Sequence, residues 1–207
     1  MYEHSTRQRL PYGVSNYYRS LARFGDPLND PIAAQYEPID AEDTQLAYES
    51  EDPIGDTRYA VTKRLIHHYQ DRALLLVCDR CATYCRHCFR RHFTGNSSGR
   101  ITPAELREAA EYVSEHPEIQ ELLISGGDPL MLGDDELKWI METVRGIRDG
   151  IIFRMCSRIP VVLPSRITQP LATLLGSFRP LWFVTHANHP TEITSQFRAA
   201  VDRLLGA

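Results

Sequence analysis

Short apolar runs alternate with amphipathic helical patterns from residue 72 to the end of the chain, and this alternation restricts the fold more than any other feature. The apolar runs are residues 73–77, 122–124, 151–155 and 181–184. The first helical pattern begins with a capping box, Thr102 to Glu105, and has Pro103 at its first position. Repeated βα units are typical of an α/β fold with a parallel sheet. We therefore predict a partial (β/α) barrel of about four βα units, with its active site at the carboxyl ends of the strands.

The chain before residue 72 has a different character. Residues 17–24 favour a helix, whereas residues 36–56 are acidic and contain several Pro and Asp residues that interrupt regular structure. We therefore divide the chain into an N-terminal, mostly helical or irregular extension, residues 1–71, and a partial barrel, residues 72–207.

Three cysteines, Cys81, Cys85 and Cys88, follow the first predicted strand with C-x3-C-x2-C spacing. Thiolates this close together in a loop can hold one iron–sulfur cluster, and three of them leave one iron of a four-iron cluster without a protein ligand. Cys78 extends the pattern to four thiolates, as in a closed zinc site. We favour the cluster because Cys78 belongs to the strand, and because zinc ligands usually form two pairs separated by a longer gap.

Composition argues against several classes of function. The 207 residues carry a net charge of −4, so the chain has no basic excess suited to nucleic acid. No apolar stretch reaches the length of a membrane-spanning helix, and the first residues lack the apolar core of a secretory signal. We expect a cytoplasmic protein with reduced cysteines and with no nucleic-acid or membrane partner.

Further motifs follow the other predicted strands. Gly126, Gly127 and Asp128 come after the second strand, residues 157–166 after the third, and residues 185–190 after the fourth. Alone, the glycines are typical of a turn between a strand and a helix. Because the carboxyl ends of parallel strands share one rim, we expect these motifs and the cysteines to form a single site.

From about residue 52 onward the chain resembles the radical S-adenosylmethionine (SAM) enzymes, and among them the lysine 2,3-aminomutase family. The resemblance rests on four motifs in the family's order, CATYCRHCFRRHFTG (81–95), LLISGGDPLML (122–132), SRIPVVLPSRIT (157–168) and THANHPTEIT (185–194). It implies a 4Fe-4S cluster that cleaves SAM to give a 5′-deoxyadenosyl radical. It also implies pyridoxal phosphate (PLP), which holds an amino-acid substrate while the amino group moves from carbon 2 to carbon 3. An electron donor such as flavodoxin or ferredoxin is expected, and the protein is a possible homo-oligomer.

The resemblance extends to individual residues of the cluster and SAM site. It makes the three loop cysteines the cluster ligands, and it assigns Gly126, Gly127 and Asp128 to the methionine amino group of SAM. His87 is expected near the cluster and SAM, although an ordinary loop histidine is the alternative reading. His186 and His189 form an H-x2-H pattern, for which we expect packing and hydrogen bonds at the rim.

Two arginines receive roles by the same resemblance. Arg90 matches the arginine that binds the substrate carboxylate, a group that guanidinium holds in a planar two-point grip. The alternative for Arg90 and Arg91 is a solvated loop that offsets negative charge. Arg72 matches a residue near the PLP phosphate, and a second basic position of that phosphate site is His68 here. Elsewhere, Cys156 is interpreted as a small buried apolar residue.

PLP enzymes hold their cofactor through a lysine, and this chain has only Lys63 and Lys138. Lys63 precedes the predicted barrel, and Lys138 should point outward from a helix, so neither matches the family's PLP lysine. We therefore interpret the chain as a truncated aminomutase-like protein or a fragment. Two alternatives stay open: a shortened radical SAM enzyme without PLP, and a noncatalytic zinc or iron–sulfur module. The substrate, whether lysine, glutamate or a protein-bound lysine, is also left open.

Overall fold

The computed structural model describes residues 10–44, 46–95 and 99–207, and its strands form one five-stranded sheet in the order β1-β2-β3-β4-β5. β1 (Leu65–Tyr69) runs antiparallel to β2 (Arg72–Cys78). The next three strands, β3 (Glu121–Gly126), β4 (Ile152–Cys156) and β5 (Leu181–Val184), run parallel to β2. The predicted parallel sheet is confirmed.

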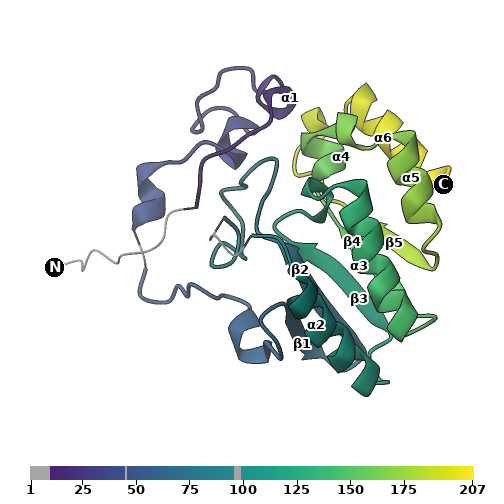
Figure 1. The fold of residues 1–207 in the computed structure, drawn as a ribbon. Coiled ribbons are helices and arrows are strands. Elements are labelled where there is room, and N and C mark those ends of the chain that lie inside the picture. Colours follow the sequence, from purple (N-terminus) through teal and green to yellow (C-terminus); the bar gives the residue numbers. More distant parts are fainter. Residues whose placement is uncertain (1–9, 45, 96–98) are drawn as a thin grey trace.

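A helix follows each parallel strand (Figure 1). α2 (Pro103–Glu115) comes after β2, and α3 (Asp134–Ile147) comes after β3. β4 leads through the single turn of α4 (Ile159–Val162) into α5 (Gln169–Gly176), and β5 leads into α6 (Ser195–Leu205). These four βα units confirm a partial (β/α) barrel.

Threonine side chains begin three of these helices. The Thr102 hydroxyl accepts a hydrogen bond from the backbone N–H of Glu105, and the Glu105 carboxylate accepts one from the backbone N–H of Thr102. Thr168 and Thr194 cap α5 and α6 in a similar way. Because the first N–H groups of a helix have no partner within the helix, these oxygens determine where each helix starts.

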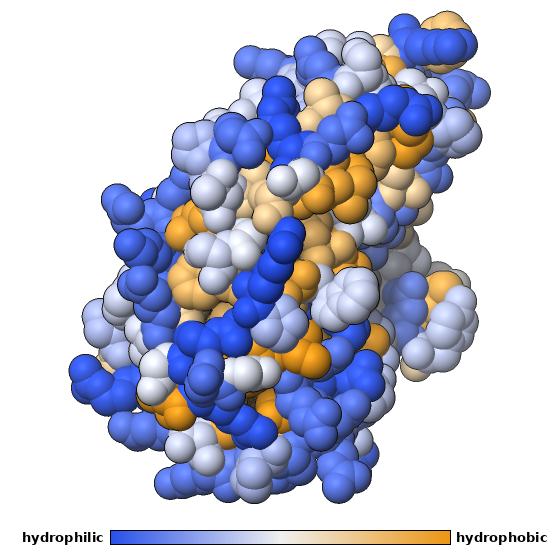
Figure 2. Space-filling view, turned by 90° about the vertical axis from the view of Figure 1, so that its right-hand side faces the viewer, coloured by the Kyte–Doolittle hydropathy of each residue, from blue (hydrophilic) through white to orange (hydrophobic). Residues whose placement is uncertain are grey.

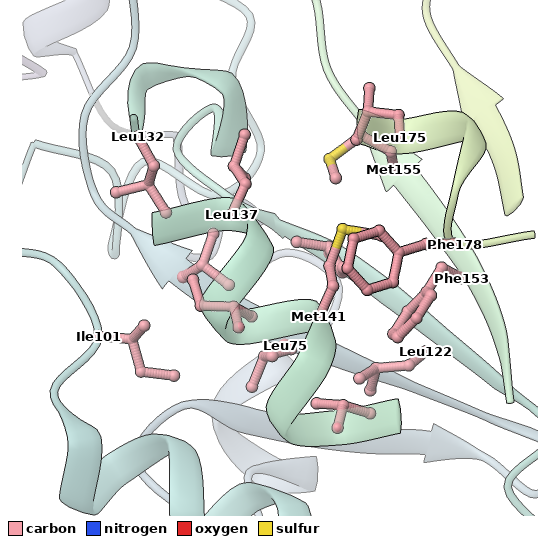
Figure 3. Close-up of a cluster of buried hydrophobic side chains, with 14 of the residues drawn as sticks. Leu75, Ile101, Leu122, Leu132, Leu137, Met141, Phe153, Met155, Leu175 and Phe178 are labelled. Atoms are coloured by element: carbon pink, nitrogen blue, oxygen red, sulfur yellow. The ribbon is translucent and has the colours of Figure 1, made fainter. Parts of the chain in front are cut away.

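The main hydrophobic core lies between the sheet and the helices (Figure 3). Leu75, Leu122 and Phe153 project from three neighbouring strands, and Leu137 and Met141 from α3 pack against them; all five are no more than 1% exposed. Burying a side chain of this size contributes about 1.5–3 kcal/mol. This core holds the strands in register and so positions the loops at their ends.

The N-terminal segment, by which we mean the described residues before β1, contains less helix than predicted. The expected helix over residues 17–24 is reduced to one turn, α1 (Asn16–Arg19). The Asp30 carboxylate accepts hydrogen bonds from the backbone N–H groups of Arg23 and Phe24, which removes these groups from any helix. Three 3-10 turns follow: η1 (Ala33–Gln35), η2 (Asp40–Asp43) and η3 (Asp56–Tyr59).

A second, smaller apolar cluster attaches this segment to the barrel. Tyr18, Ile32 and Tyr36 pack against Val161 and Val162 of α4. Figure 1 shows the segment, in purple and blue, beside the teal loop that follows β2. Backbone hydrogen bonds join the two, because the N–H of residue 84 donates to the carbonyl of residue 13.

β1 lies in the part of the chain that we assigned to the extension. It forms a hairpin with β2, in which Leu65 faces Leu75 and Tyr69 faces Arg72. Its sequence LIHHY has only two aliphatic residues, so neither a buried run nor clear alternation predicts a strand. The sheet therefore begins before residue 72, while the division into two domains stays a prediction.

One edge of the sheet is open. Among the described strands, β5 pairs only with β4, and on this strand Trp182 is 64% exposed and Val184 is 45% exposed. Figure 2 views the side of the molecule where β5, α5 and α6 lie, and it shows apolar groups between hydrophilic ones. The inner face of the partial barrel is thus open along β5.

No helix within the described ranges is both long and apolar enough to span a membrane.

Candidate active site at the carboxyl ends of the strands

A cavity of about 370 Å³ lies at the carboxyl ends of the parallel strands. Its walls come from the loop after β2, the ends of β3 and β4, and the residues that follow β5. The predicted site residues that line it are Cys81, Cys85, His87, Cys88, Arg90, Gly126, Gly127, Asp128 and His186. The structure therefore brings motifs from four separate loops around one space.

Three thiols share this cavity. Cys81, Cys85 and Cys88 line it, and none of them is in a disulfide. Burial raises the pKa of Cys81 well above its usual range, and the Asp128 carboxylate and the neighbouring thiols act in the same direction. Burial also raises the pKa of Cys85, against the effect of the Arg158 cation. Thiolates in this place need a positive partner, such as iron.

The arrangement of the thiols bears on which metal group fits. Within the described residues, no set of three or more His, Cys, Asp or Glu side chains is closed around one point like a single-ion site. A four-iron cluster is larger than a zinc ion, and each of its thiolate ligands binds a different iron at a corner of the cluster. Three thiols around an open cavity fit such a cluster.

Cys78 is separate from these thiols. It ends β2, is 1% exposed, and donates its S–H to the carbonyl oxygen of Asp128 at 3.1 Å. Burial raises its pKa to about 12. The residues that line the cavity do not include it. Its position in the core argues against the four-thiolate zinc alternative.

The glycine pair after β3 is explained by backbone packing. Gly126 has φ of +124°, and a Cβ on it would overlap the carbonyl oxygen of Cys78. A Cβ on Gly127 would lie 2.5 Å from the carbonyl oxygen of Arg80. The family resemblance assigned these glycines to the methionine amino group of SAM, which stays a prediction. In the structure they allow β3 to end against the start of the cysteine loop.

Asp128 connects two strands. Its carboxylate accepts hydrogen bonds from the Ser157 hydroxyl at 2.7 Å and from the backbone N–H groups of Arg158 and Leu130 at 2.8 and 3.1 Å. Burial raises its pKa, and these hydrogen bonds oppose that effect. The carboxylate therefore fixes the end of β3 to the end of β4, and its role toward SAM stays a prediction.

Arg90 is anchored at one edge of its guanidinium group. Nε donates to the buried carboxylate of Asp56 at 2.7 Å, and the group lies 4.9 Å from the centroid of the Phe89 ring. Arg72 lies elsewhere, at the start of β2, where it pairs with Asp71. It shares a sheet face with Leu74, two residues further along, which lines the cavity.

The two rim histidines differ. His186 lines the cavity, and the centroid of its ring lies 6.3 Å from that of His87. Burial lowers the pKa of His186 and of His87. Both rings are therefore neutral at neutral pH and can donate one hydrogen bond and accept another. His189 instead accepts a hydrogen bond from the backbone N–H of Thr191. The expected hydrogen bond is thus found for His189, whereas His186 makes a ring contact with His87.

Cys156 does not occupy the expected core position. It is only partly buried and lines the cavity, because it lies on the inner face of β4. Phe153 and Met155, on the other face of the same strand, are the ones buried against the helices. The interpretation failed because a short apolar strand does not show from sequence which alternate residues face the core.

Arg158, for which the sequence predicted no role, lies in the wall of the cavity. It is 6% exposed and donates to the Cys85 sulfur at 2.8 Å and to a carboxylate oxygen of Glu192 at 2.7 Å. The available signal was an arginine just after a predicted strand, in the SRIP motif. Its partners are distant in sequence and could not be inferred.

Comparison with known families identifies this arrangement. The family model described as the radical SAM superfamily matches residues 75–173, a range that contains the cysteine loop and the ends of β3 and β4. Residues 75–173 of this chain are a radical SAM domain. The radical SAM match therefore covers most of the residues that form the cavity wall.

Three of the relatives that this chain matches are named 2,3-aminomutases. It is 39% identical to L-lysine 2,3-aminomutase of Clostridium subterminale, over 96% of this chain and 47% of that protein. It is 37% identical to the enzyme of the same name from Acetoanaerobium sticklandii, over 96% and 48% of the two chains. Glutamate 2,3-aminomutase of Clostridioides difficile is 35% identical, over 95% and 46%. The chain spans about half the length of the curated relatives it matches.

The two lysines of this chain lie away from the cavity. Lys63 is 68% exposed and pairs with Glu105 at 2.7 Å. Lys138 is 53% exposed and lies 3.8 Å from Glu142 on the same helix, so it points outward as predicted. Neither lines the cavity. The lysines of this chain therefore do not fit the role of a PLP-binding residue at this site.

Proposed function

We propose that this chain provides the cluster-binding and SAM-binding part of a radical SAM enzyme of the 2,3-aminomutase type. Cys81, Cys85 and Cys88 hold a 4Fe-4S cluster, and SAM lies in the cavity beside residues 126–128. When bound, the cluster supplies the electron that cleaves SAM to methionine and a 5′-deoxyadenosyl radical. The observation that carries the proposal is the position of three free thiols around one cavity of about 370 Å³.

The residues around the thiols have distinct tasks in this proposal. A reactive radical must be shielded from water, and the buried residues of the cavity wall shield it on the sides away from the open edge at β5. His87 and His186 are neutral and supply hydrogen bonds to the nucleoside part of SAM. Arg90 uses Nε for Asp56, which within the described residues leaves its terminal nitrogens for a substrate carboxylate. The chain thus offers separate places for SAM and for an amino acid.

The proposed substrate is an amino acid. Similarity to two lysine aminomutases favours lysine, and similarity to a glutamate aminomutase keeps glutamate as the second choice. An electron donor such as flavodoxin or ferredoxin would reduce the cluster. No lysine of this chain reaches the cavity, so PLP has no part in the chemistry proposed for these residues.

One observation favours a second candidate, a radical SAM enzyme that cleaves SAM without PLP. The exposed positions of Lys63 and Lys138 give PLP no attachment at the cavity of this chain. Addition of PLP, reduction with borohydride and peptide mapping distinguishes the two. A specific adduct at either lysine, together with turnover of the amino acid, would contradict the placement of the site described above.

Anaerobic reconstitution tests the proposed function. The chain is treated with iron and sulfide, and iron and sulfide are then quantified per chain. SAM and dithionite are added, and 5′-deoxyadenosine and methionine are measured. We expect four irons per chain and reductive cleavage of SAM, both absent in Cys81→Ala. Stoichiometric zinc without bound sulfide would support the noncatalytic alternative instead.

A further inference from the structure

A buried polar network centred on Arg158 joins parts of the chain that are distant in sequence. Its Nη2 donates to a carboxylate oxygen of Glu192 at 2.7 Å, to the Tyr18 hydroxyl at 2.9 Å, and to the side-chain oxygen of Gln35. Arg158, Glu192, Tyr18 and Gln35 are 6%, 0%, 0% and 8% exposed. The network therefore connects the start of α4 with the N-terminal segment and with the loop after β5.

Glu192 is held as a charged partner in this network. It accepts hydrogen bonds from Tyr18, from Gln35 Nε2 at 3.0 Å, and from the backbone N–H groups of residues 188–189. Burial opposes its charge, but the Tyr18 hydroxyl, the Arg158 cation and these N–H groups lower its pKa overall. A buried ion pair persists only when such additional bonds satisfy it, so each partner constrains the other.

The other end of Arg158 reaches the cysteine loop. Nη1 donates to the sulfur of Cys85, the middle cysteine of the motif, at 2.8 Å. The N-terminal segment holds the same loop by its backbone, because residue 86 donates to the carbonyl of Gln35 at 2.9 Å and residue 84 donates to the carbonyl of Gly13 at 2.9 Å. Thus the segment that Arg158 contacts also flanks Cys85 on both sides.

We propose that Arg158 is a positioning residue with two effects: it fastens the N-terminal segment and the cysteine loop around Cys85, and it favours the reduced state of a cluster bound there. The second effect rests on the proposed function, and the first does not. An N–H donor and a positive charge beside a thiolate ligand stabilise the state with the additional electron, which raises the reduction potential.

Arg158→Met in the full chain removes the guanidinium group and keeps an apolar stem. Arg166→Met is the matched control, because Arg166 occupies the second Ser-Arg of the same motif but donates to the carbonyls of Leu130 and Leu132. Hydrogen exchange is measured on the metal-free protein. We expect residues 14–36 and 83–88 to exchange about tenfold faster in Arg158→Met, and to be unchanged in Arg166→Met. Equal rates of hydrogen exchange in wild type and Arg158→Met would show that Arg158 does not hold the N-terminal segment and the cysteine loop in place.

The redox effect is measured on the reconstituted protein by titration with dithionite, with the reduced cluster followed by electron paramagnetic resonance. We expect the equilibrium constant for reduction of the cluster to be about tenfold lower in Arg158→Met. This corresponds to a shift of the reduction potential by about −59 mV for a one-electron couple. Glu192→Gln keeps the cation at Cys85, so its potential does not fall, while the N-terminal segment exchanges faster. An unchanged potential in Arg158→Met overturns this effect. A wild type that binds no cluster overturns the proposed function instead, and the exchange experiment still decides the fastening.

If Arg158→Met does not fold, Tyr18→Phe replaces it, because this change removes one bond to Nη2 and leaves the charges in place. Faster exchange in residues 14–36 with an unchanged potential supports the proposal. Exchange equal to that of wild type, or a potential that falls, contradicts it.

Discussion

The two faces of the sheet differ although the same strands build both. On the face covered by helices, Leu75, Ile124 and Phe153 are 0% exposed and form one continuous core. On the inner face, Leu74 and Cys156 are only partly buried and border the cavity. Alternation along each strand thus separates residues that stabilise the fold from residues that line the site.

The inner face also carries charge between its strands. Arg154 of β4 pairs with Glu121 of β3 at 2.5 Å, on the face that holds Leu74 and Cys156. Apolar contacts with helices hold the outer face together, whereas the inner face depends on specific pairs and on whatever fills the cavity. Substitutions should therefore affect stability on the outer face and ligand binding on the inner face.

The largest expected effect is on iron content. Cys85→Ala removes a thiol that lines the cavity, so we expect it to lose the cluster almost completely. Cys78→Ala, in the core, and Cys156→Ala, at the cavity but outside the motif, should keep the cluster. The measurement is iron and sulfide per chain after reconstitution. If Cys78→Ala lost iron as fully as Cys85→Ala, the separation of core and cavity cysteines would be wrong.

The second effect compares stability on the two faces. Phe153→Ala leaves a void in the helix-covered core and should lower the free energy of unfolding by about 3–5 kcal/mol. Leu74→Ala, on the inner face, should lower it by about 1 kcal/mol, because the residue is already partly exposed. Urea denaturation measures both. Equal losses would show that the inner face contributes to the core as much as the outer face.

A third effect arises where the faces meet, at the end of β3. Gly127→Ala places a Cβ 2.5 Å from the Arg80 carbonyl, so we expect a loss of about 1–3 kcal/mol and a lower iron content together with weaker SAM binding. Gly146→Ala in α3 is the control, because nothing lies within 4 Å of the added atom. Normal iron content with weaker SAM binding would instead support the predicted contact of these glycines with SAM.

The smallest effect concerns the helix side at low pH. Burial opposes the charge on Glu105, but hydrogen bonds from Lys63, Thr102 and Arg64 lower its pKa to about 2. The folded pKa is below the unfolded value of about 4.3, so this stabilisation is present above pH 4.3 and is lost as the pH falls toward 2. Glu105→Gln should cost about 1 kcal/mol at pH 7, and the difference from wild type should vanish near pH 2.

Glu108→Gln provides the control for this prediction, because Glu108 lies exposed on the same helix. Thermal or urea unfolding from pH 7 to pH 2 measures the difference. If the two variants lost equal stability at pH 7, the contacts of Glu105 would not contribute.

Local pattern predicted most of the barrel elements. The capping box at Thr102 and the apolar spacing of Leu137 and Met141 determine helices within one stretch of chain, and both helices are found. β1 and the N-terminal segment were not predicted correctly. β1 is stable because its Leu65 packs beside Leu75 of β2, and the turn near Arg23 depends on Asp30. Such contacts join residues that are not neighbours in the hydrophobic pattern, so the periodicity of the sequence does not predict them.

For the site, sequence alone determined the three loop cysteines, the glycines after β3 and their common place at the strand ends, because spacing and strand direction are local properties. The tertiary structure decided which face each residue occupies, so that Cys156 reaches the cavity and Cys78 does not. It also brought Arg158 to Cys85, 73 positions apart, and to Tyr18, 140 positions apart. Buried polar partners are selected by the geometry of the packed chain, and that geometry exists only after the core between sheet and helices has formed.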